Sequence, residues 1–177
     1  GDRVHVADSA GAVYIFERDL GGPDNWGLRA KLAPAGLTPF NYFGYHVAID
    51  GDTLAIGALG DATNGSFGGA VHIFERDLGG PDNWGFRTKL TASGGAALDF
   101  YGIDMDIDAD TLVVGATQAD GAATNAGAAY VYERDSGGSD NWGEVTKLVP
   151  SVASEDGNFG GAVAIDGDVI AVGAYRH

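Results

Sequence analysis

The sequence has no cysteine and few basic residues. Its 177 residues include 10 Lys and Arg against 25 Asp and Glu, so the formal net charge is −15. The absence of cysteine excludes disulfides, thiol catalysis and cysteine metal sites. The acidic balance repels phosphate backbones and anionic lipid, which argues against nucleic-acid and membrane-surface roles. There is no recognisable signal peptide and no apolar run long enough to span a bilayer, so we expect no membrane insertion.

The motifs of common enzyme classes are also missing. The sequence has no H-E-x-x-H, no G-x-S-x-G, no phosphate loop and no histidine pair at metal spacing. Nothing in it pairs a nucleophile with a base. We therefore expect a non-enzymatic protein without a cofactor. The alternative is a carboxylate-based hydrolase or lyase acting on extracellular polymer, because Asp and Glu are abundant.

What the sequence has instead is a period of 58 residues. Trp26, Trp84 and Trp142 are spaced by this period, and the same turn surrounds each of them. The turn reads ERDLGGPDNWG at 17–27 and 75–85, and ERDSGGSDNWG at 133–143. A fixed period of this size indicates a repeat architecture, in which each unit buries its apolar faces against its neighbours.

Each repeat predicts four strands, which we name A to D. Residues 43–50 alternate in polarity, and Asp50-Gly51 after them favours a tight hairpin turn. Residues 53–58 suit a strand buried on both faces, 70–75 form a third strand and 84–90 a fourth, more polar one. The 30 glycines fit short strands joined by turns. Four antiparallel strands in a repeating unit predict the blade of a β-propeller and an all-β chain.

The period divides the chain into about three blades. Two are complete, at 42–99 and 100–157, and two are partial, at 1–41 and 158–177. Propellers usually close with about four to eight blades, so the predicted arc is open. Open edges expose unpaired backbone that can pair with another chain. Further copies or segments that complete the propeller are therefore expected partners, and a structural subunit assembling into an oligomer or filament is one alternative function.

The pattern F-G-x-x-V-x-I-D-G-D-x-h-x-V-G-A, with h an apolar residue, resembles the FG-GAP repeat. This repeat is the blade motif of the integrin α-subunit propeller and of many bacterial secreted proteins. The three copies read FGYHVAIDGDTLAIGAL at 43–59, YGIDMDIDADTLVVGAT at 101–117 and FGGAVAIDGDVIAVGAY at 159–175. The resemblance implies a segment of a seven-bladed propeller. It also implies an extracellular or cell-surface bacterial protein that works by adhesion or by binding a protein or glycan ligand.

The connection between strands A and B departs from the calcium-binding members of that family, which carry a longer acidic loop there. In this chain it is reduced to Asp-Gly-Asp or Asp-Ala-Asp, at 50–52, 108–110 and 166–168. Too few oxygens converge to supply the roughly six to eight ligands that calcium takes. We therefore expect no metal at these turns, and calcium at another kind of site stays open.

Two carboxylates break the repeat. Asp104 and Asp106 stand where another copy has His46 and Ala48. Strand A is the innermost strand of a propeller blade, so we expect these carboxylates to face the central channel. There Asp104, Asp106 and His46 are candidates for binding a cation or another ligand. The alternative is that they form a solvated channel wall.

The loops between strands B and C (59–69, 117–127) and between strands D and A (33–41, 91–99, 149–158) differ among copies. In FG-GAP propellers these loops lie on one rim, which is the ligand face of integrins. Loops on a rigid scaffold often carry recognition. The candidate ligand-binding residues on these loops are Asp61, Asn64, Asp120, Asn125, Glu155 and Asp156.

Residues that are identical in every copy are expected to serve the scaffold. The turns between strands C and D are rich in Asp and Asn, which commonly hydrogen-bond their own backbone. The tryptophans at the same place in each repeat are expected to pack between blades. His72 replaces a tyrosine of the other copies, and His5 replaces an aliphatic residue, so both are predicted to be core or strand-face residues.

Overall fold

The computed structural model describes residues 9–121 and 123–176. His5, predicted to be a core or strand-face residue, lies outside these residues. The described residues form only strands, turns and loops, and they contain no helix that could cross a membrane. The predicted all-β class is confirmed.

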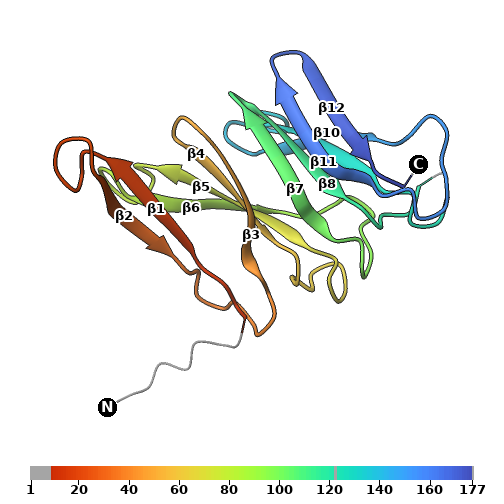
Figure 1. Cartoon of the computed structure of the whole chain (residues 1–177), viewed down its shortest axis with the longest axis horizontal. Coiled ribbons are helices and arrows are strands. Elements are labelled where there is room, and N and C mark those ends of the chain that lie inside the picture. Colours follow the sequence, from red (N-terminus) through yellow and green to blue (C-terminus); the bar gives the residue numbers. More distant parts are fainter. Residues whose placement is uncertain (1–8, 122, 177) are drawn as a thin grey trace.

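In the described residues, twelve strands form four antiparallel sheets, and within each sheet strands that follow one another in sequence are neighbours. The two central sheets have four strands each, and the first and last sheets have two described strands each. Figure 1 shows the four sheets side by side in chain order, from β1 and β2 to β11 and β12. The strands are β1 (Val13–Arg18), β2 (Trp26–Leu32), β3 (Phe43–Asp50), β4 (Thr53–Ala58), β5 (Ala70–Arg76), β6 (Trp84–Leu90), β7 (Tyr101–Asp108), β8 (Thr111–Ala116), β9 (Ala128–Glu133), β10 (Gly143–Leu148), β11 (Phe159–Asp166) and β12 (Val169–Ala174).

The F-G pair of the repeat makes an irregularity at the start of each inner strand. The pairing of β11 with β12 shifts register between Phe159 and Ala162, and Gly160 lies inside this shift with φ of +86°. A Cβ on Gly160 would come within 2.2 Å of the carbonyl oxygen of Ala128, which belongs to the preceding blade. Only glycine combines this backbone conformation with so close an approach. The glycine therefore allows the inner strand to lie against the preceding sheet.

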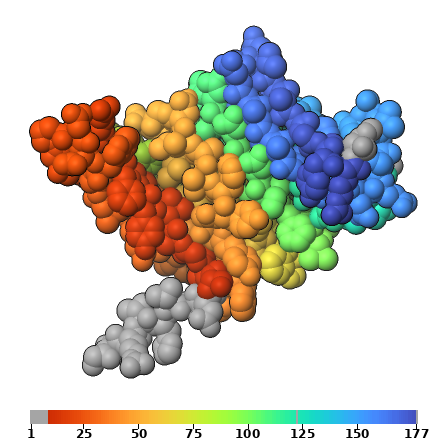
Figure 2. Space-filling model, viewed as in Figure 1, coloured from red at the N-terminus to blue at the C-terminus, as the bar shows by residue number. Residues whose placement is uncertain are grey.

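The apolar core is divided among the seams between neighbouring blades. Strands β4 and β8 are buried almost throughout, as the sequence predicts for a strand covered on both faces. Three clusters of buried side chains fill the three seams. Figure 2 shows the blades packed into one continuous body, without a gap between successive sheets on the visible face. No blade encloses a core of its own, so each one depends on its neighbours for stability.

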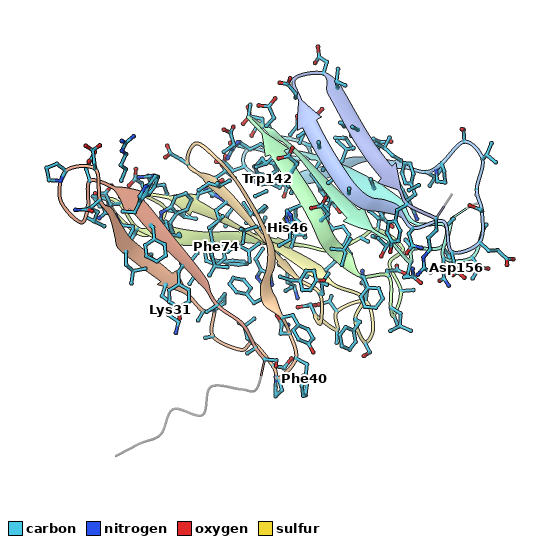
Figure 3. All side chains as sticks on the ribbon, viewed as in Figure 1. Lys31, Phe40, His46, Phe74, Trp142 and Asp156 are labelled. Atoms are coloured by element: carbon cyan, nitrogen blue, oxygen red, sulfur yellow. The ribbon has the colours of Figure 1, made fainter. Side chains whose placement is uncertain are left out.

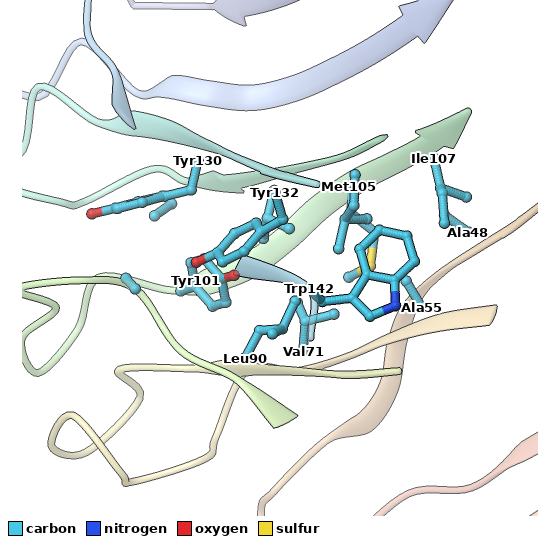
Figure 4. Close-up of a cluster of buried hydrophobic side chains, with 14 of the residues drawn as sticks. Ala48, Ala55, Val71, Leu90, Tyr101, Met105, Ile107, Tyr130, Tyr132 and Trp142 are labelled. Carbon is cyan, nitrogen blue, oxygen red and sulfur yellow. The ribbon is translucent and has the colours of Figure 1, made fainter. Parts of the chain in front are cut away.

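The tryptophans show how much each blade depends on the one before it. Trp142 is 1% exposed and packs in the central seam with Ala55, Val71 and Met105 (Figure 4). Trp84 is likewise buried in the first seam. Trp26 is 67% exposed, so the expectation that all three tryptophans pack between blades is wrong for this copy. Within the described residues there is no preceding sheet to cover it.

Candidate functional site

The meander places the connections of each blade at two opposite ends. The turns between strands A and B and between strands C and D lie at one end, which we call the turn rim. The loops between strands B and C and between strands D and A lie at the other end, which we call the loop rim. The loop rim consists of residues 33–42, 59–69, 91–100, 117–121 with 123–127, and 149–158. Figure 3 shows Phe40 and Asp156 from two of its loops, outside the ends of the sheets.

Hydrogen bonds fasten the first long loop of the loop rim. Asp61 accepts hydrogen bonds from the backbone nitrogen and the hydroxyl of Thr63, at 2.9 and 2.6 Å. Lys89 on β6 donates to the same hydroxyl at 2.7 Å. Burial alone would raise the pKa of the Asp61 carboxyl, but the Thr63 hydrogen bonds and the Lys89 charge lower it. Asp61 therefore stays ionised and holds its loop against β6.

The second long loop is fastened by other predicted residues. Asn125 donates from its backbone to Asp120 and from its side chain to Asp156, both at 3.0 Å. Asn64 of the first loop donates to the carbonyl oxygen of Ala92 at 3.0 Å. Glu155 is exposed beside Asp156. The structure thus brings Asp120, Asn125 and Asp156 together, while Asp61 and Asn64 belong to another loop.

The most distinctive feature of the loop rim is a row of aromatic side chains. The ring centroids of Phe40 and Tyr42 are 6.4 Å apart, those of Tyr42 and Phe67 6.1 Å, and those of Phe67 and Phe100 6.0 Å. These distances are typical of interacting rings. The row runs from the loop before β3 to the loop before β7. It joins two complete blades on the surface rather than in the core.

A pocket of about 490 Å³ opens beside this row. It spans three blades, because residues on or next to β3, β7, β11 and β12 contribute to it. Its volume lies within the range of small-molecule sites, about 300–1,000 Å³. We call it the rim pocket. Its aromatic lining is Tyr42, Tyr45, Phe67, Phe100 and Tyr175, its aliphatic lining Leu59 and Ile103, and its polar lining Thr117, Gln118, Asn158 and Arg176.

The polar side of the rim pocket is held by a small network. Gln118 donates from its amide nitrogen to the side-chain oxygen of Asn158 at 2.9 Å. The Tyr175 hydroxyl donates to the same oxygen at 3.2 Å. Asn158 is 3% exposed and its amide nitrogen donates to the carbonyl oxygen of Asp156. The pocket therefore combines aromatic faces with amide groups whose positions are fixed.

The backbone in front of each inner strand is strained in the same way. Tyr42, Phe100 and Asn158 occupy corresponding places in the repeat and have φ of +54°, +54° and +56°. Residues other than glycine rarely adopt this left-handed backbone region, and bulky residues such as Tyr and Phe adopt it least often. Because all three copies share the strain, it belongs to the blade design. Its consequence is that the residue before each F-G pair points toward the rim pocket.

The inner-strand carboxylates lie between blades, which corrects the expectation that they face a central channel. Asp104 accepts a hydrogen bond from the backbone nitrogen of Val163 at 2.7 Å, and Asp106 accepts one from Ile165 at 2.9 Å. His46 approaches the other oxygen of Asp104 to 2.7 Å, and Figure 3 shows it in the middle of the sheet stack. The faces of a blade pack against its neighbours, so side chains of the inner strand point at the next sheet. These three residues form a tie between blades.

The shortened turns between strands A and B are used in a similar way. Asp50 accepts a hydrogen bond from the backbone of Ala109 at 2.8 Å, and Asp108 accepts one from Gly167 at 2.7 Å. These oxygens therefore bond to the next blade. Across the described residues, no group of three or more His, Asp or Glu side chains is arranged to hold a metal ion.

An ion-pair network on the turn rim was missed by the sequence reading. Glu75 accepts hydrogen bonds from Arg87 of its own blade at 2.7 Å and from Arg134 of the next blade at 2.9 Å. Arg134 also pairs with Asp110 at 2.6 Å and lies 4.7 Å from the Trp142 ring. Glu75 is buried, and its bond from Arg134 crosses from one blade to the next, so the network is part of the seam. The same contacts recur one blade earlier with Glu17, Arg29, Arg76, Asp52 and Trp84.

In the turns between strands C and D, Asp and Asn side chains hydrogen-bond the backbone of their own turn, as the sequence predicts. Asp19, Asp77 and Asp135 each accept a hydrogen bond from the backbone nitrogen five residues later, at 2.7, 2.6 and 2.9 Å. The turn-closing Asn83 and Asn141 donate to backbone oxygens at 2.9 and 3.0 Å. These residues therefore set the turn. His72 is buried, as predicted for a core position.

The family comparison agrees with this geometry. The model of the FG-GAP repeat matches residues 26–74, 84–132 and 142–177, which is more than half of the chain. The chain belongs to the FG-GAP repeat family. Its four-stranded antiparallel sheets are FG-GAP blades and form part of a β-propeller. Among curated proteins, none matches the sequence significantly.

Within the FG-GAP repeats, the two rims contain different kinds of residue. The turn rim carries the residues that recur at every copy, such as the Glu and Arg of E-R-D. The loop rim carries residues that change between copies, and the rim pocket is built from these. The sequence reading selected polar loop residues and overlooked the aromatic ones. The available signal was that Phe40, Tyr42, Phe67 and Phe100 lie outside strands, where large aromatic side chains are not required for a core.

Proposed function

We propose that this FG-GAP segment is a non-enzymatic binding module of an extracellular or cell-surface protein, acting through its loop rim. The observation that carries the proposal is the aromatic row with the adjoining rim pocket, which together span three blades. Aromatic rings on a surface supply contact area at a small cost in side-chain entropy. A pocket that combines such rings with a few fixed polar groups has the composition of a ligand site.

The rigidity of the rim supports the same proposal. Lys89 on β6 holds the first long loop to its blade, the Asn125–Asp156 pair joins the second long loop to the loop after β10, and backbone bonds join further loops. Leu98 donates to the carbonyl oxygen of Ser66 at 2.9 Å, and Phe100 to that of Phe67 at 3.1 Å. A preorganised surface loses less conformational entropy when it binds. Family membership is consistent with this use, because FG-GAP propellers commonly serve binding and adhesion.

The test compares matched tyrosine variants. Tyr45→Ser removes a ring that is 58% exposed in the rim pocket, whereas Tyr14→Ser removes one that is 50% exposed on β1, away from it. The fluorescently labelled chain is applied to immobilised extracellular matrix proteins and to a panel of glycans. We expect wild type and Tyr14→Ser to bind the same targets and Tyr45→Ser to lose at least about tenfold in affinity, which is 1.4 kcal/mol.

Controls separate binding from folding and from catalysis. Tyr45→Ser should change the free energy of unfolding by less than about 0.5 kcal/mol, as is usual for exposed positions. Incubation of the chain with polysaccharides should release no reducing ends or unsaturated products. Binding that is unaffected by Tyr45→Ser, or turnover of a polysaccharide, would contradict the proposed function.

A second candidate function rests on the edge strand β12. Its counterparts β4 and β8 each pair with a third strand, whereas β12 pairs only with β11 among the described residues. Val169 at its start is 69% exposed. A free strand edge can pair with a second copy and so support a structural subunit. Light scattering across a range of concentrations tests this: a constant monomer mass would exclude self-assembly of the chain.

A further inference from the structure

The rim pocket also indicates which chemical class of ligand it accepts. We propose that it binds a neutral glycan by stacking sugar rings on tyrosine faces, an inference that rests on the proposed binding function. Three features of the pocket favour such a ligand: the exposure of the rings, the polar groups beside them and the charge of the lining. Each of these comes from a different set of residues.

The exposed rings provide flat surfaces at the pocket mouth. Tyr45 and Tyr175 are 58% and 69% exposed, and Tyr42 is 36% exposed. A pyranose ring has faces of C–H groups that pack against an aromatic face while its hydroxyls stay at the edges, in water. Tyrosine suits such a ligand, because its ring is apolar and its hydroxyl can both donate and accept hydrogen bonds. An apolar peptide side chain would instead be favoured by an enclosed pocket that removes it from water.

The polar lining matches hydroxyl groups. Amide side chains offer both donors and acceptors, as sugar hydroxyls do. The hydrogen bonds of Gln118 within the described residues use its amide nitrogen, so its carbonyl oxygen is left for a ligand hydroxyl. Its position is fixed by the bond to Asn158, itself almost completely buried. The pocket thus places a hydrogen-bond acceptor beside the aromatic faces.

The charge of the site favours a neutral ligand. The lining contains no carboxylate, and Arg176 is its one charged side chain. A cationic ligand would meet this guanidinium and would find no counter-charge in the lining. An anionic polysaccharide would approach a chain with a net charge of −15, which repels it at long range. Neither sign of ligand charge is therefore favoured.

The experiment measures binding of purified chain to neutral tetrasaccharides of glucose and N-acetylglucosamine by NMR and calorimetry, with oligoalginate as the anionic comparison. We expect at least one neutral oligosaccharide to bind. Tyr45→Ser and Tyr175→Ser should each weaken it by about tenfold or more, and Tyr14→Ser by less than about twofold. Oligoalginate should bind at least about tenfold more weakly.

The outcomes separate this inference from the proposed function. If no neutral oligosaccharide binds, but a matrix protein binds in a manner that depends on Tyr45, the glycan inference is overturned and the binding function stands. If neither binds, both fail. Equal binding of oligoalginate, or equal loss of affinity in Tyr14→Ser, would also overturn the inference, because the ligand would then not be selected by the rings and charge of the rim pocket.

Discussion

The two rims of this molecule use side chains for opposite purposes. On the turn rim, Glu75 accepts hydrogen bonds from Arg87 of its own blade and from Arg134 across the seam. On the loop rim, Tyr45 and Tyr175 extend into solvent beside a pocket. One end of the repeat thus holds the blades together, while the other end varies between copies. Substitutions at the turn rim should therefore change stability, and substitutions at the loop rim should mainly change binding.

The largest expected effect is the loss of the buried tryptophan near the turn rim. Trp142→Ala should lower the free energy of unfolding by about 3–5 kcal/mol, because it leaves a cavity in the central seam. The matched control, Trp26→Ala, removes the exposed copy and should cost less than about 1 kcal/mol. Denaturant unfolding followed by circular dichroism measures both. Equal losses would show that the two positions are not distinguished by packing.

The next effect comes from the ion-pair network. Glu75→Ala leaves Arg87 and Arg134 without their shared carboxylate, and we expect a loss of about 1–3 kcal/mol. Its repeat counterpart Glu133 is exposed and takes part in no ion pair among the described residues. Glu133→Ala should therefore change stability by less than about 0.5 kcal/mol. If Glu133→Ala were as damaging as Glu75→Ala, the network would not be what stabilises the turn rim.

A smaller and opposite effect is expected at a turn between strands A and B. Ala109 has φ of +50°, and its counterpart Gly51 has φ of +52° with no atom near its missing Cβ. A left-handed conformation costs alanine about 1–2 kcal/mol, part of which is offset because glycine is more flexible when unfolded. Ala109→Gly should stabilise the chain by about 0.5–1 kcal/mol, and Gly51→Ala should destabilise it similarly. The midpoint of denaturant unfolding reports both, and a destabilising Ala109→Gly would contradict this account.

The smallest expected effect tests charge burial on the loop rim. Asp99 is 5% exposed, and burial raises the pKa of its carboxyl above the ordinary 3.8, although the Ala96 amide donates to it at 2.7 Å. A raised pKa means that the folded state favours the protonated carboxyl. The contribution of Asp99 to the free energy of unfolding is therefore greatest at pH values below 3.8 and is lost as the pH rises through the pKa of the folded state. Asp99→Asn, which copies Asn41, should therefore be stabilising at about pH 7.

The stability difference between Asp99→Asn and wild type should depend on pH. The advantage of Asp99→Asn over wild type should shrink as the pH falls toward the ordinary carboxyl pKa, because the wild-type side chain then becomes neutral as well. Thermal unfolding at about pH 7 and about pH 4 measures the difference. An advantage that grows on acidification would reverse the sign and contradict the burial argument.

The sequence alone determined the architecture. The period of 58 residues, the alternation of residues 43–50 and the Asp-Gly turns predicted four-stranded blades, and the strand bounds agree closely. These features are local, since a strand and a tight turn depend on neighbouring residues. The repeat also separated constant positions from variable ones, and so pointed to the loop rim before any contact was known.

The contacts of individual side chains, by contrast, depend on how the sheets pack on one another. Asp104 and Asp106 were expected in a channel, but their partners are backbone groups of β11, about one repeat later in the chain. The rim pocket likewise depends on Tyr45, Phe100 and Tyr175 meeting across three blades. The packing of one sheet on the next sets these distances, and identical repeats give different neighbours to each copy. For that reason Trp26 and Trp142 share a sequence context but differ in burial.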